Sequence, residues 1–230
     1  MAKRAAIYGG TFDPVHCGHL EVARRVLKLF ELDEVIFVPA WVPPHKRHAN
    51  ITSAFHRLAM LALATEQDQN LRVSTVELDA PQFPYAVETV ARMEDAAERL
   101  FFLIGADSWA EISTWHEWPR LLQMCELIVV TRPGYEIDPG AAPAAQVVDV
   151  RGGAASGIAE LLASDHRPRV FVTDVAMIDI SATRIRSAAQ RNDFAGLRAM
   201  VPPTVAAYIE KYNLYGNLDE SEVKRKIFKS

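Results

Sequence analysis

Two histidines near the start of the chain have the spacing to act on a phosphate group. His16 and His19 are three residues apart, so if a helix begins around them both imidazoles can point into one cleft. Gly18 leaves space between the two rings, and Gly9 and Gly10 permit a ligand to approach the backbone closely. The pattern predicts two hydrogen-bond donors that face the same phosphate.

A metal site is an alternative for the same spacing, because His-x-x-His can supply two zinc ligands. No further cluster of cysteine or acidic residues nearby completes such a site. A histidine taken alone is more often an ordinary polar or structural residue than a catalytic one. We therefore predict no metal site formed by the protein, and the phosphate interpretation depends on where the pair lies in the fold.

A second candidate phosphate site lies near the other end of the chain, at Ser181 and Arg186. Ser181 is a favourable N-cap, and the first-turn N–H groups of the helix that it begins would face outward. Arg186 follows about one turn later, where its guanidinium can clamp phosphate oxygens. Arg184 is interpreted either as a solvent-facing cation or as a further phosphate contact.

The elements that must position these residues alternate along the chain. Short β-rich runs recur with helix-like segments between them, which predicts an α/β fold with a Rossmann-like, doubly wound parallel sheet. Ligands bind beyond the carboxyl ends of the strands of such a sheet, where residues 9–19 should lie. Strands are expected over 5–8, 35–38, 71–78, 100–104, 127–130 and 170–172, and helices over 19–30, 53–65, 87–93, 181–190 and 204–212. Residues 135–168 are interpreted as a mostly peripheral connection with a helical patch at 158–162.

Composition places the chain among ordinary globular proteins. Of its 230 residues 50% are apolar and 23% charged, which suffices for one well-buried domain over residues 1–216, followed by a charged, solvated tail over 217–230. The net charge of −4 gives no general attraction to nucleic acid or to an anionic membrane. Cys17 and Cys125 indicate no disulfide framework, and no apolar run has the length of a signal peptide or a membrane span. We predict a cytoplasmic protein.

Residues 9–19 resemble the signature of bacterial nicotinate-mononucleotide adenylyltransferases, a family of the HxGH nucleotidyltransferase superfamily. Residues 104–108 (Ile-Gly-Ala-Asp-Ser) and 180–186 (Ile-Ser-Ala-Thr-Arg-Ile-Arg) resemble two further motifs of that family, and they occur in the family's order. The resemblance covers residues 5–215 and implies the single-domain fold of the nucleotidyltransferase type.

For ATP, the resemblance implies a site in which His16 and His19 are catalytic and donate to the α-phosphate region. Asp107 would orient a ribose hydroxyl or the adenine amino group, and a plain helix cap is the alternative for this residue. Mg²⁺ would accompany the triphosphate as the cofactor. The residues implied to bind ATP are Gly9, Gly10, Thr11, Phe12, His16, His19, Gly105, Asp107, Ser181, Thr183 and Arg186.

For the second substrate, the resemblance implies a phosphate contact and a ring-binding segment. Pro39 and residues 43–46 resemble a loop in which Lys46 approaches ligand phosphates, although a rigid loop with an exposed lysine would look the same. Residues 114–118 resemble the segment that holds the pyridine ring, with Trp115 stacking on it and His116 matching by position; a buried aromatic pair is the alternative. Residues 132–135 match a family turn that is mainly structural.

One departure from the family concerns residues 84–86. The family usually has Ser-Tyr-Thr here, whereas this chain has Pro84, Tyr85 and Ala86. Tyr85 and Ala86 are still implied to contact the mononucleotide, and a backbone contact at Ala86 could persist. The threonine hydroxyl is absent and Pro84 lacks a backbone donor, so the choice between the acid and amide forms of the mononucleotide stays open.

The reaction implied by the resemblance is direct attack of the 5′-phosphate of nicotinate mononucleotide on the α-phosphorus of ATP. It gives nicotinate adenine dinucleotide and pyrophosphate without a covalent enzyme intermediate, and catalysis consists of holding two anions in line. The alternatives are another acceptor, such as nicotinamide mononucleotide or phosphopantetheine, and a catalytically silent nucleotide-binding regulator. A class I aminoacyl-tRNA synthetase is disfavoured because no Lys-Met-Ser-Lys-Ser-like loop is found. The oligomeric state is left open, a homo-oligomer included.

Overall fold

The computed structural model describes residues 3–41, 51–79, 85–131, 146–152, 158, 160–162, 169–175 and 180–216. These residues form a seven-stranded sheet in the order β3-β2-β1-β4-β5-β7-β6, and every neighbouring pair of strands is parallel. The strands are β1 (Arg4–Gly10), β2 (Glu34–Pro39), β3 (Leu71–Val73), β4 (Arg99–Gly105), β5 (Glu126–Val130), β6 (Gln146–Asp149) and β7 (Arg169–Thr173). The predicted single-domain α/β fold with a parallel sheet is confirmed.

The central strands are apolar at nearly every position, and they are buried on both faces. All six residues of β2 are buried, and Ala5, Ala6 and Ile7 of β1 have no exposed surface. Successive side chains of a strand point to opposite faces, so Phe101 and Phe102 of β4 enter different hydrophobic cores. This unbroken apolar pattern is expected of a parallel sheet that helices cover on both sides.

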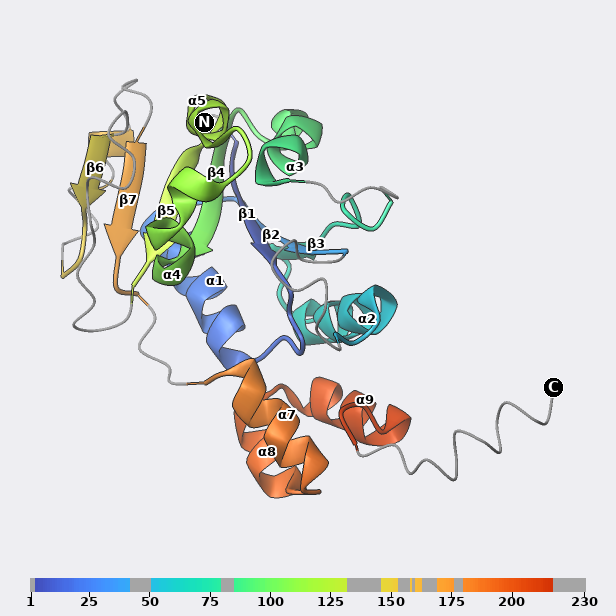
Figure 1. Ribbon diagram of the computed structural model, residues 1–230. Coiled ribbons are helices and arrows are strands. Elements are labelled where there is room, and N and C mark those ends of the chain that lie inside the picture. Colours follow the sequence, from blue (N-terminus) through green and yellow to red (C-terminus); the bar gives the residue numbers. More distant parts are fainter. Residues whose placement is uncertain are drawn as a thin grey trace.

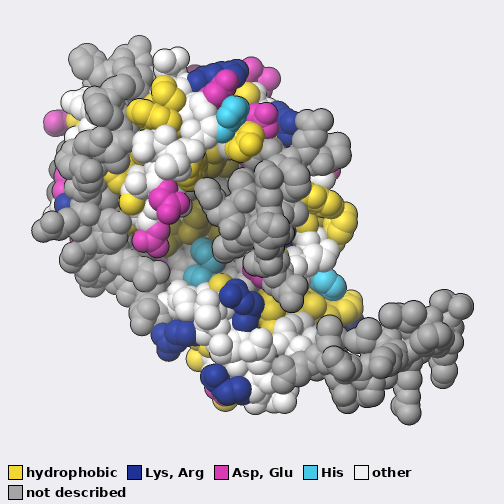
Figure 2. All heavy atoms as spheres, viewed as in Figure 1, with side chains coloured by type: hydrophobic (Ala, Val, Ile, Leu, Met, Phe, Trp, Pro, Cys, Tyr) yellow, Lys and Arg dark blue, Asp and Glu magenta, His cyan; other side chains and the backbone are white. Residues whose placement is uncertain are grey.

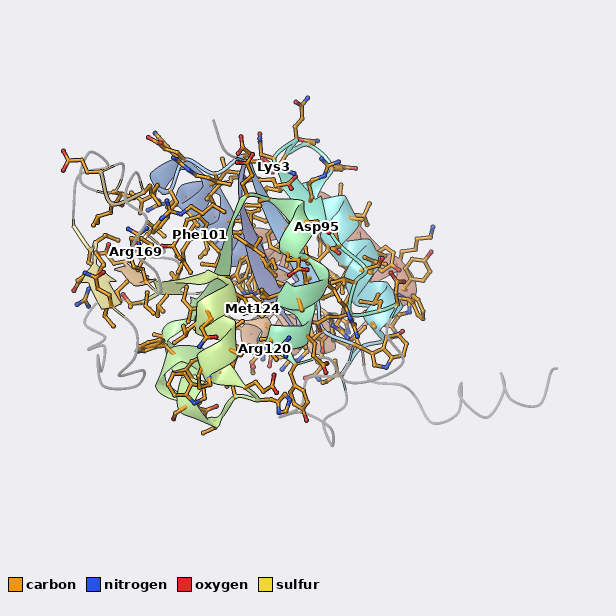
Figure 3. The ribbon with its side chains drawn as sticks, turned by 90° about the horizontal axis from the view of Figure 1, so that it is seen from above. Lys3, Asp95, Phe101, Arg120, Met124 and Arg169 are labelled. Atoms are coloured by element: carbon orange, nitrogen blue, oxygen red, sulfur yellow. The ribbon has the colours of Figure 1, made fainter. Side chains whose placement is uncertain are left out.

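Helices cover the two faces as two groups (Figure 1). One core joins the sheet to α1, α2 and the C-terminal helices, and the other joins it to α3, α4 and α5. Figure 3 shows Phe101 on the side of α1 and Met124 of α5 on the opposite side. The helices are α1 (Cys17–Leu29), α2 (Ala54–Thr65), α3 (Ala86–Arg92), α4 (Ala106–Ala110), α5 (Trp118–Met124), α7 (Ala182–Gln190), α8 (Phe194–Met200) and α9 (Pro203–Tyr212). Every helix among the described residues is too short or too polar to cross a lipid bilayer.

The two ends of the sheet differ in character. At the amino ends of the strands, the buried carboxylate of Glu126 accepts from Nε of Arg99 at 2.6 Å and from Nε of Arg169 at 2.8 Å, which ties β4, β5 and β7 together. At the carboxyl ends, the chain winds outward in both directions from β1 and β4, so a topological switch point lies between these strands. Ligands of open parallel sheets bind at such a point.

The expected strand over residues 71–78 is shorter than predicted, because it ends at Val73. The Ser74 hydroxyl accepts from the N–H of Val76, and the Thr75 carbonyl accepts from two N–H groups further on, at 2.7 and 2.9 Å. Serine and threonine often start turns through such local bonds. The prediction of a longer strand, which rested on alternating apolar residues, was therefore wrong beyond Val73.

Other elements were missing from the prediction. The interpretation of residues 135–168 as a mostly peripheral connection missed β6, which pairs with β7 at the edge of the sheet, while residues 158 and 160–162 are helical as expected. The sequence prediction also omitted α8, whose N-cap Asp193 accepts from the Gly196 N–H at 2.9 Å. Both elements are short, so their hydrophobic periodicity gave little signal.

Candidate active site

The two histidines lie at the first turn of α1, which begins at Cys17 rather than at the predicted His19. His16 is the N-cap residue. Its Nδ1 accepts from the His19 N–H at 3.4 Å, and Nδ1 of His19 accepts from the His16 N–H at 3.3 Å. This reciprocal capping pair satisfies two donors of the helix end and stacks the rings, with centroids 3.6 Å apart and planes 22° apart. The imidazoles thus point the same way, as their spacing predicted.

Hydrogen bonding and burial set the protonation of the pair. Because each Nδ1 accepts a backbone hydrogen bond, the proton of each neutral ring lies on Nε2. Burial lowers the pKa of His16 to about 4, and burial together with the neighbouring His16 ring holds the pKa of His19 well below its usual range. At neutral pH each uncharged ring therefore offers one Nε2–H donor.

The loop before α1 is shaped around these rings. A Cβ at Gly18 would lie 3.0 Å from Nδ1 of His16, and a Cβ at Gly10 would lie 2.9 Å from the ring of Phe12. Phe12 has a positive φ of 49°, a strained conformation for a bulky residue. Its ring meets Tyr8 and His19 edge-on, with centroids 5.5 and 5.0 Å away. This packing holds the strained loop in place.

A cavity of about 530 Å³ opens at the histidines, between the carboxyl ends of β1 and β4 and the start of α7. We call it the histidine cavity. Figure 2 shows histidine side chains at the bottom of a hollow in this face and cationic side chains below them. The predicted residues that line the cavity are Thr11, Phe12, His16, His19, Gly105, Asp107, Ser181 and Arg186.

The start of α7 brings the second predicted motif to the same cavity. Ser181 is the N-cap of α7, and its hydroxyl accepts from the Arg184 N–H at 3.3 Å. Arg186 donates to the Asp13 carbonyl at 2.8 Å and to the Thr183 hydroxyl at 3.3 Å. Arg186 therefore joins the two motifs directly. Thr183 is exposed and lies outside the lining of the histidine cavity.

The helix that follows β4 is capped by Gly105 and not by Asp107. The N-cap of α4 is Gly105, and Asp107 lies in the first turn of that helix, so the interpretation of Asp107 as the cap was wrong. Its carboxylate is exposed and lines the histidine cavity. A Cβ at Gly105 would meet nothing within 4 Å, so the space beside this backbone is open.

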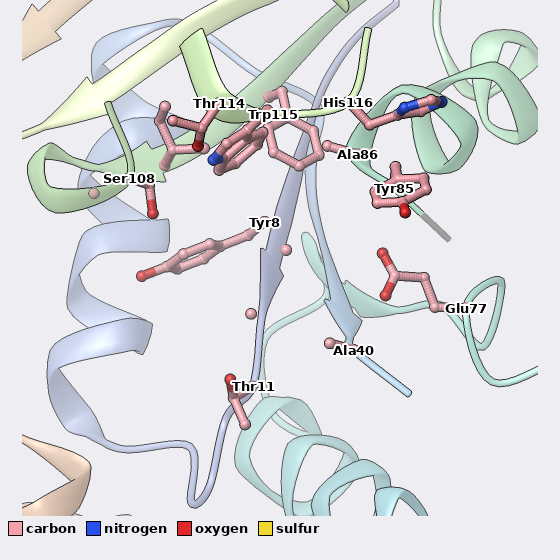
Figure 4. Close-up of a pocket in the computed structure, with 15 residues that line it drawn as sticks. Tyr8, Thr11, Ala40, Glu77, Tyr85, Ala86, Ser108, Thr114, Trp115 and His116 are labelled. Atoms are coloured by element: carbon pink, nitrogen blue, oxygen red, sulfur yellow. The ribbon is translucent and has the colours of Figure 1, made fainter. Parts of the chain in front are cut away.

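A second cavity, of about 290 Å³, lies on the other side of the same strand ends. We call it the tryptophan cavity. Figure 4 shows Trp115, His116 and Tyr85 around it, and the rings of Tyr85 and His116 lie 4.3 Å apart. Trp115 is partly buried and meets Phe102 edge-on at 6.3 Å. Tyr85, Ala86, Trp115 and His116, the residues predicted for the mononucleotide, all line this cavity.

The two cavities adjoin at the switch point of the sheet. Five residues line both of them: Tyr8, Thr11, Ile104, Gly105 and Ser108. Gly9 and Gly10, which were predicted to bind ATP, line the tryptophan cavity rather than the histidine cavity. The five shared residues therefore form the partition between the two spaces. Two bound molecules could meet across it.

A buried arginine braces this partition. Arg57 of α2 is 1% exposed, and its guanidinium donates to four carbonyl groups at 2.6 to 2.9 Å. One carbonyl belongs to Thr11, which both cavities share, and another to Ala40, which lines the tryptophan cavity. The other two belong to Trp41 and Thr52. Arg57 thus fixes the β1 loop against the segment that follows β2.

Sequence reasoning missed several lining residues and could not place others. Lys46, Pro84 and the turn at 132–135 lie outside the described residues. Arg57 and Glu77 were given no role, although a charged residue within the apolar sequence of α2 was a usable signal for Arg57. Glu77 follows a strand that ends earlier than expected, so its direction could not be predicted.

The model of the cytidylyltransferase-like family matches residues 7–188, which is most of the chain. The protein is therefore a nucleotidyltransferase, and the paired histidines at a helix start beside the switch point of a parallel sheet agree with that class.

Relatives narrow the class. A protein of Chromobacterium violaceum named "Probable nicotinate-nucleotide adenylyltransferase" is 37% identical over 94% of this chain and 100% of its own length. One of Thermoanaerobacter sp. with the same name is 34% identical over 96% of this chain and 98% of its own. The chain belongs to the nicotinate-nucleotide adenylyltransferase family.

A solved structure agrees in fold. The nicotinic acid mononucleotide adenylyltransferase of Plasmodium falciparum complexed with NaAD superposes with a TM-score of 0.68 at 19% sequence identity, covering 93% of this chain and 97% of that one. The same enzyme complexed with APC gives a TM-score of 0.66 at 20% identity, again over 93% of this chain and 97% of that one.

Proposed function

We propose that this enzyme transfers the adenylyl group of ATP to nicotinate mononucleotide, giving nicotinate adenine dinucleotide and pyrophosphate. The observation that carries the proposal is the pair of adjoining cavities, which differ in chemistry. The histidine cavity presents the guanidinium of Arg186 and neutral donors for a triphosphate, and the tryptophan cavity presents aromatic faces for a pyridine ring. The relatives named for this reaction support the same assignment.

The residues of the histidine cavity would stabilise the transition state. An oxygen of the mononucleotide 5′-phosphate attacks the α-phosphorus of ATP, and the bond from that phosphorus to the bridging oxygen breaks, so pyrophosphate leaves. His16 and His19 would each donate an Nε2–H to the α-phosphate, whose negative charge would raise the pKa of both rings. Arg186 and the first-turn N–H groups of α7 would hold the departing phosphates.

Residues of the tryptophan cavity would orient the acceptor. Trp115 would stack on the pyridine, Tyr85 and His116 would close the aromatic wall, and Lys46 would approach the phosphates. The magnesium ion would enter with ATP, bound to its phosphates. Asp107 is the exposed carboxylate of the histidine cavity that could reach a Mg²⁺–ATP complex or a ribose hydroxyl.

The test is pyrophosphate release from Mg-ATP with nicotinate mononucleotide, nicotinamide mononucleotide and phosphopantetheine as separate acceptors. We expect turnover with the pyridine mononucleotides and a preference for the acid form. Turnover with phosphopantetheine alone would overturn the proposal. ATP binding without turnover on any acceptor would instead support the catalytically silent regulator.

We also propose that the enzyme is cytoplasmic, that residues 1–216 form the catalytic domain and that residues 217–230 form a charged tail that the reaction does not need. We include a homo-oligomer in the proposal. Truncation after residue 216 should leave kcat unchanged, cell fractionation tests the location, and light scattering gives the oligomeric state.

A further inference from the structure

The tryptophan cavity contains a carboxyl group, Glu77, which would repel an acidic substrate when it is ionised. Its ionisable lining side chains among the described residues are Tyr8, Glu77, Tyr85 and His116, and lysine and arginine are absent from this part of the lining. A nicotinate ring carries a carboxylate, whereas a nicotinamide ring carries a neutral amide. An ionised Glu77 would therefore repel the acceptor assigned above. This inference rests on the proposed function and deepens it.

Glu77 is held in the cavity by a contact from α3. It leaves the turn after β3, and its Oε1 accepts from the Thr89 hydroxyl at 2.7 Å. Thr89 is fully buried, one helical turn beyond Tyr85. Figure 4 shows the Glu77 side chain directed into the cavity, close to Tyr85. Within the described residues, the second carboxylate oxygen, Oε2, forms no hydrogen bond, so it is available to a ligand.

The charges around Glu77 do not fix it as an anion. Arg92 from α3 and Arg57 from α2 are near enough to favour the ionised form, as does the bond from Thr89. Arg57, however, directs its guanidinium to four carbonyl groups. Burial has the largest effect, and it raises the pKa of Glu77 from its ordinary value of 4.5 to about 7. Across the cavity, the ionisable side chains are those of Tyr8, Tyr85 and His116.

We propose that Glu77 determines specificity in the tryptophan cavity: nicotinate mononucleotide binds when Glu77 carries a proton, and the ionised residue favours the amide form. A protonated carboxyl can donate to the nicotinate carboxylate, and an ionised one can accept from the carboxamide N–H₂. The proton comes from solvent when the acid binds. Glu77 would thereby replace the ligand contact of the threonine hydroxyl that the family usually has at residue 86, where this chain has alanine.

The sign of the pH effect follows from the charges. Nicotinate is ionised throughout the range from pH 6 to 8.5, so its binding favours the protonated form of Glu77, and its affinity falls as pH rises through the pKa of that residue. The amide has no charge on the ring substituent and is not repelled. Specificity for the acid over the amide should therefore fall as pH rises.

The experiment measures kcat/KM for both mononucleotides between pH 6 and 8.5, at saturating Mg-ATP, in the wild-type enzyme, Glu77→Gln and Glu94→Gln. The ratio of the acid value to the amide value is the readout, because both acceptors carry the same 5′-phosphate and its titration cancels. In the wild-type enzyme we expect the ratio to fall about tenfold over this range. In Glu77→Gln it should be independent of pH. Glu94 is exposed and lines neither cavity, so Glu94→Gln should behave as wild type.

A second variant tests the proposal if Glu77→Gln folds poorly. Thr89→Val keeps the carboxyl group and removes the donor that lowers its pKa, so the ratio should change at a higher pH than in the wild-type enzyme. A wild-type ratio that does not depend on pH, or the same dependence in Glu77→Gln, would overturn this inference alone. Absence of turnover with both mononucleotides would overturn the proposed function as well.

Discussion

The histidine cavity and the tryptophan cavity adjoin, but their lining side chains are held in position by different kinds of contact. Around the histidine cavity, backbone hydrogen bonds fix the side chains: His16 and His19 cap α1, Ser181 caps α7, and Arg186 binds the Asp13 carbonyl. Around the tryptophan cavity, side chains mainly contact other side chains, as Tyr85 does with His116. A rigid first cavity suits charge stabilisation, which needs fixed donors. The second cavity depends on ring contacts and on one carboxyl group that can change its charge.

The largest effect should follow from His19→Ala, which removes one fixed donor from the histidine cavity. We expect kcat to fall by about 10² to 10³, the scale of one preorganised donor, while KM for the mononucleotide changes little. His56→Ala is the matched control, since His56 binds the Tyr208 hydroxyl and lines neither cavity. Steady-state kinetics with a thermal melt separates catalysis from folding. A nearly unchanged rate would remove His19 from the catalytic residues.

The contrast in how the cavities are held explains what could be predicted from sequence. His16, His19 and Gly18 act within one helical turn, so their spacing alone indicated a shared direction. Glu77 depends on Thr89, which comes from a helix beyond a turn, and periodicity says nothing about such a contact. Likewise, β6 is short and lies at the edge of the sheet, where only its pairing with β7 defines it.

Arg57→Met should damage both cavities, because Arg57 braces the partition between them. Its removal leaves four carbonyl groups without their donor, and we expect the free energy of unfolding to fall by about 3 kcal/mol. Urea unfolding measures this change. Arg25→Met is the control, because the exposed Arg25 binds only Glu21 among the described residues. If Arg57→Met were as stable as that control, the brace would have no energetic role.

Trp115→Ala should affect substrate binding in the tryptophan cavity and leave substrate binding in the histidine cavity nearly unchanged. We expect KM for the mononucleotide to rise about tenfold, the scale of one aromatic stacking contact, and KM for ATP to stay within about twofold. Trp118→Ala is a close control, since Trp118 packs against the same core but lines neither cavity. Titration of each substrate at a saturating level of the other gives both constants. Equal rises in the two KM values would mean that Trp115 supports the partition instead of the pyridine.

The smallest effect concerns stability, and it tests whether the tryptophan cavity is dry enough to oppose a charge. In the unfolded chain the Glu77 carboxyl titrates near its ordinary pKa of 4.5, and in the folded protein its pKa is about 7. Between these values the folded state binds more protons, so the contribution of Glu77 to the free energy of unfolding falls as pH rises. Glutamine does not titrate, and its amide oxygen can still accept from Thr89.

Glu77→Gln should therefore become more stable relative to the wild-type enzyme by about 1 kcal/mol between pH 5 and pH 8, with water in the open cavity limiting the effect. Urea unfolding of both proteins at the two pH values measures the difference, and Glu94→Gln serves as the exposed control. An equal stability difference at both pH values would mean that Glu77 ionises in the cavity without cost. The Glu77 carboxyl would then be as well solvated in the tryptophan cavity as it is in bulk water. Aromatic contacts alone would distinguish this cavity from the histidine cavity.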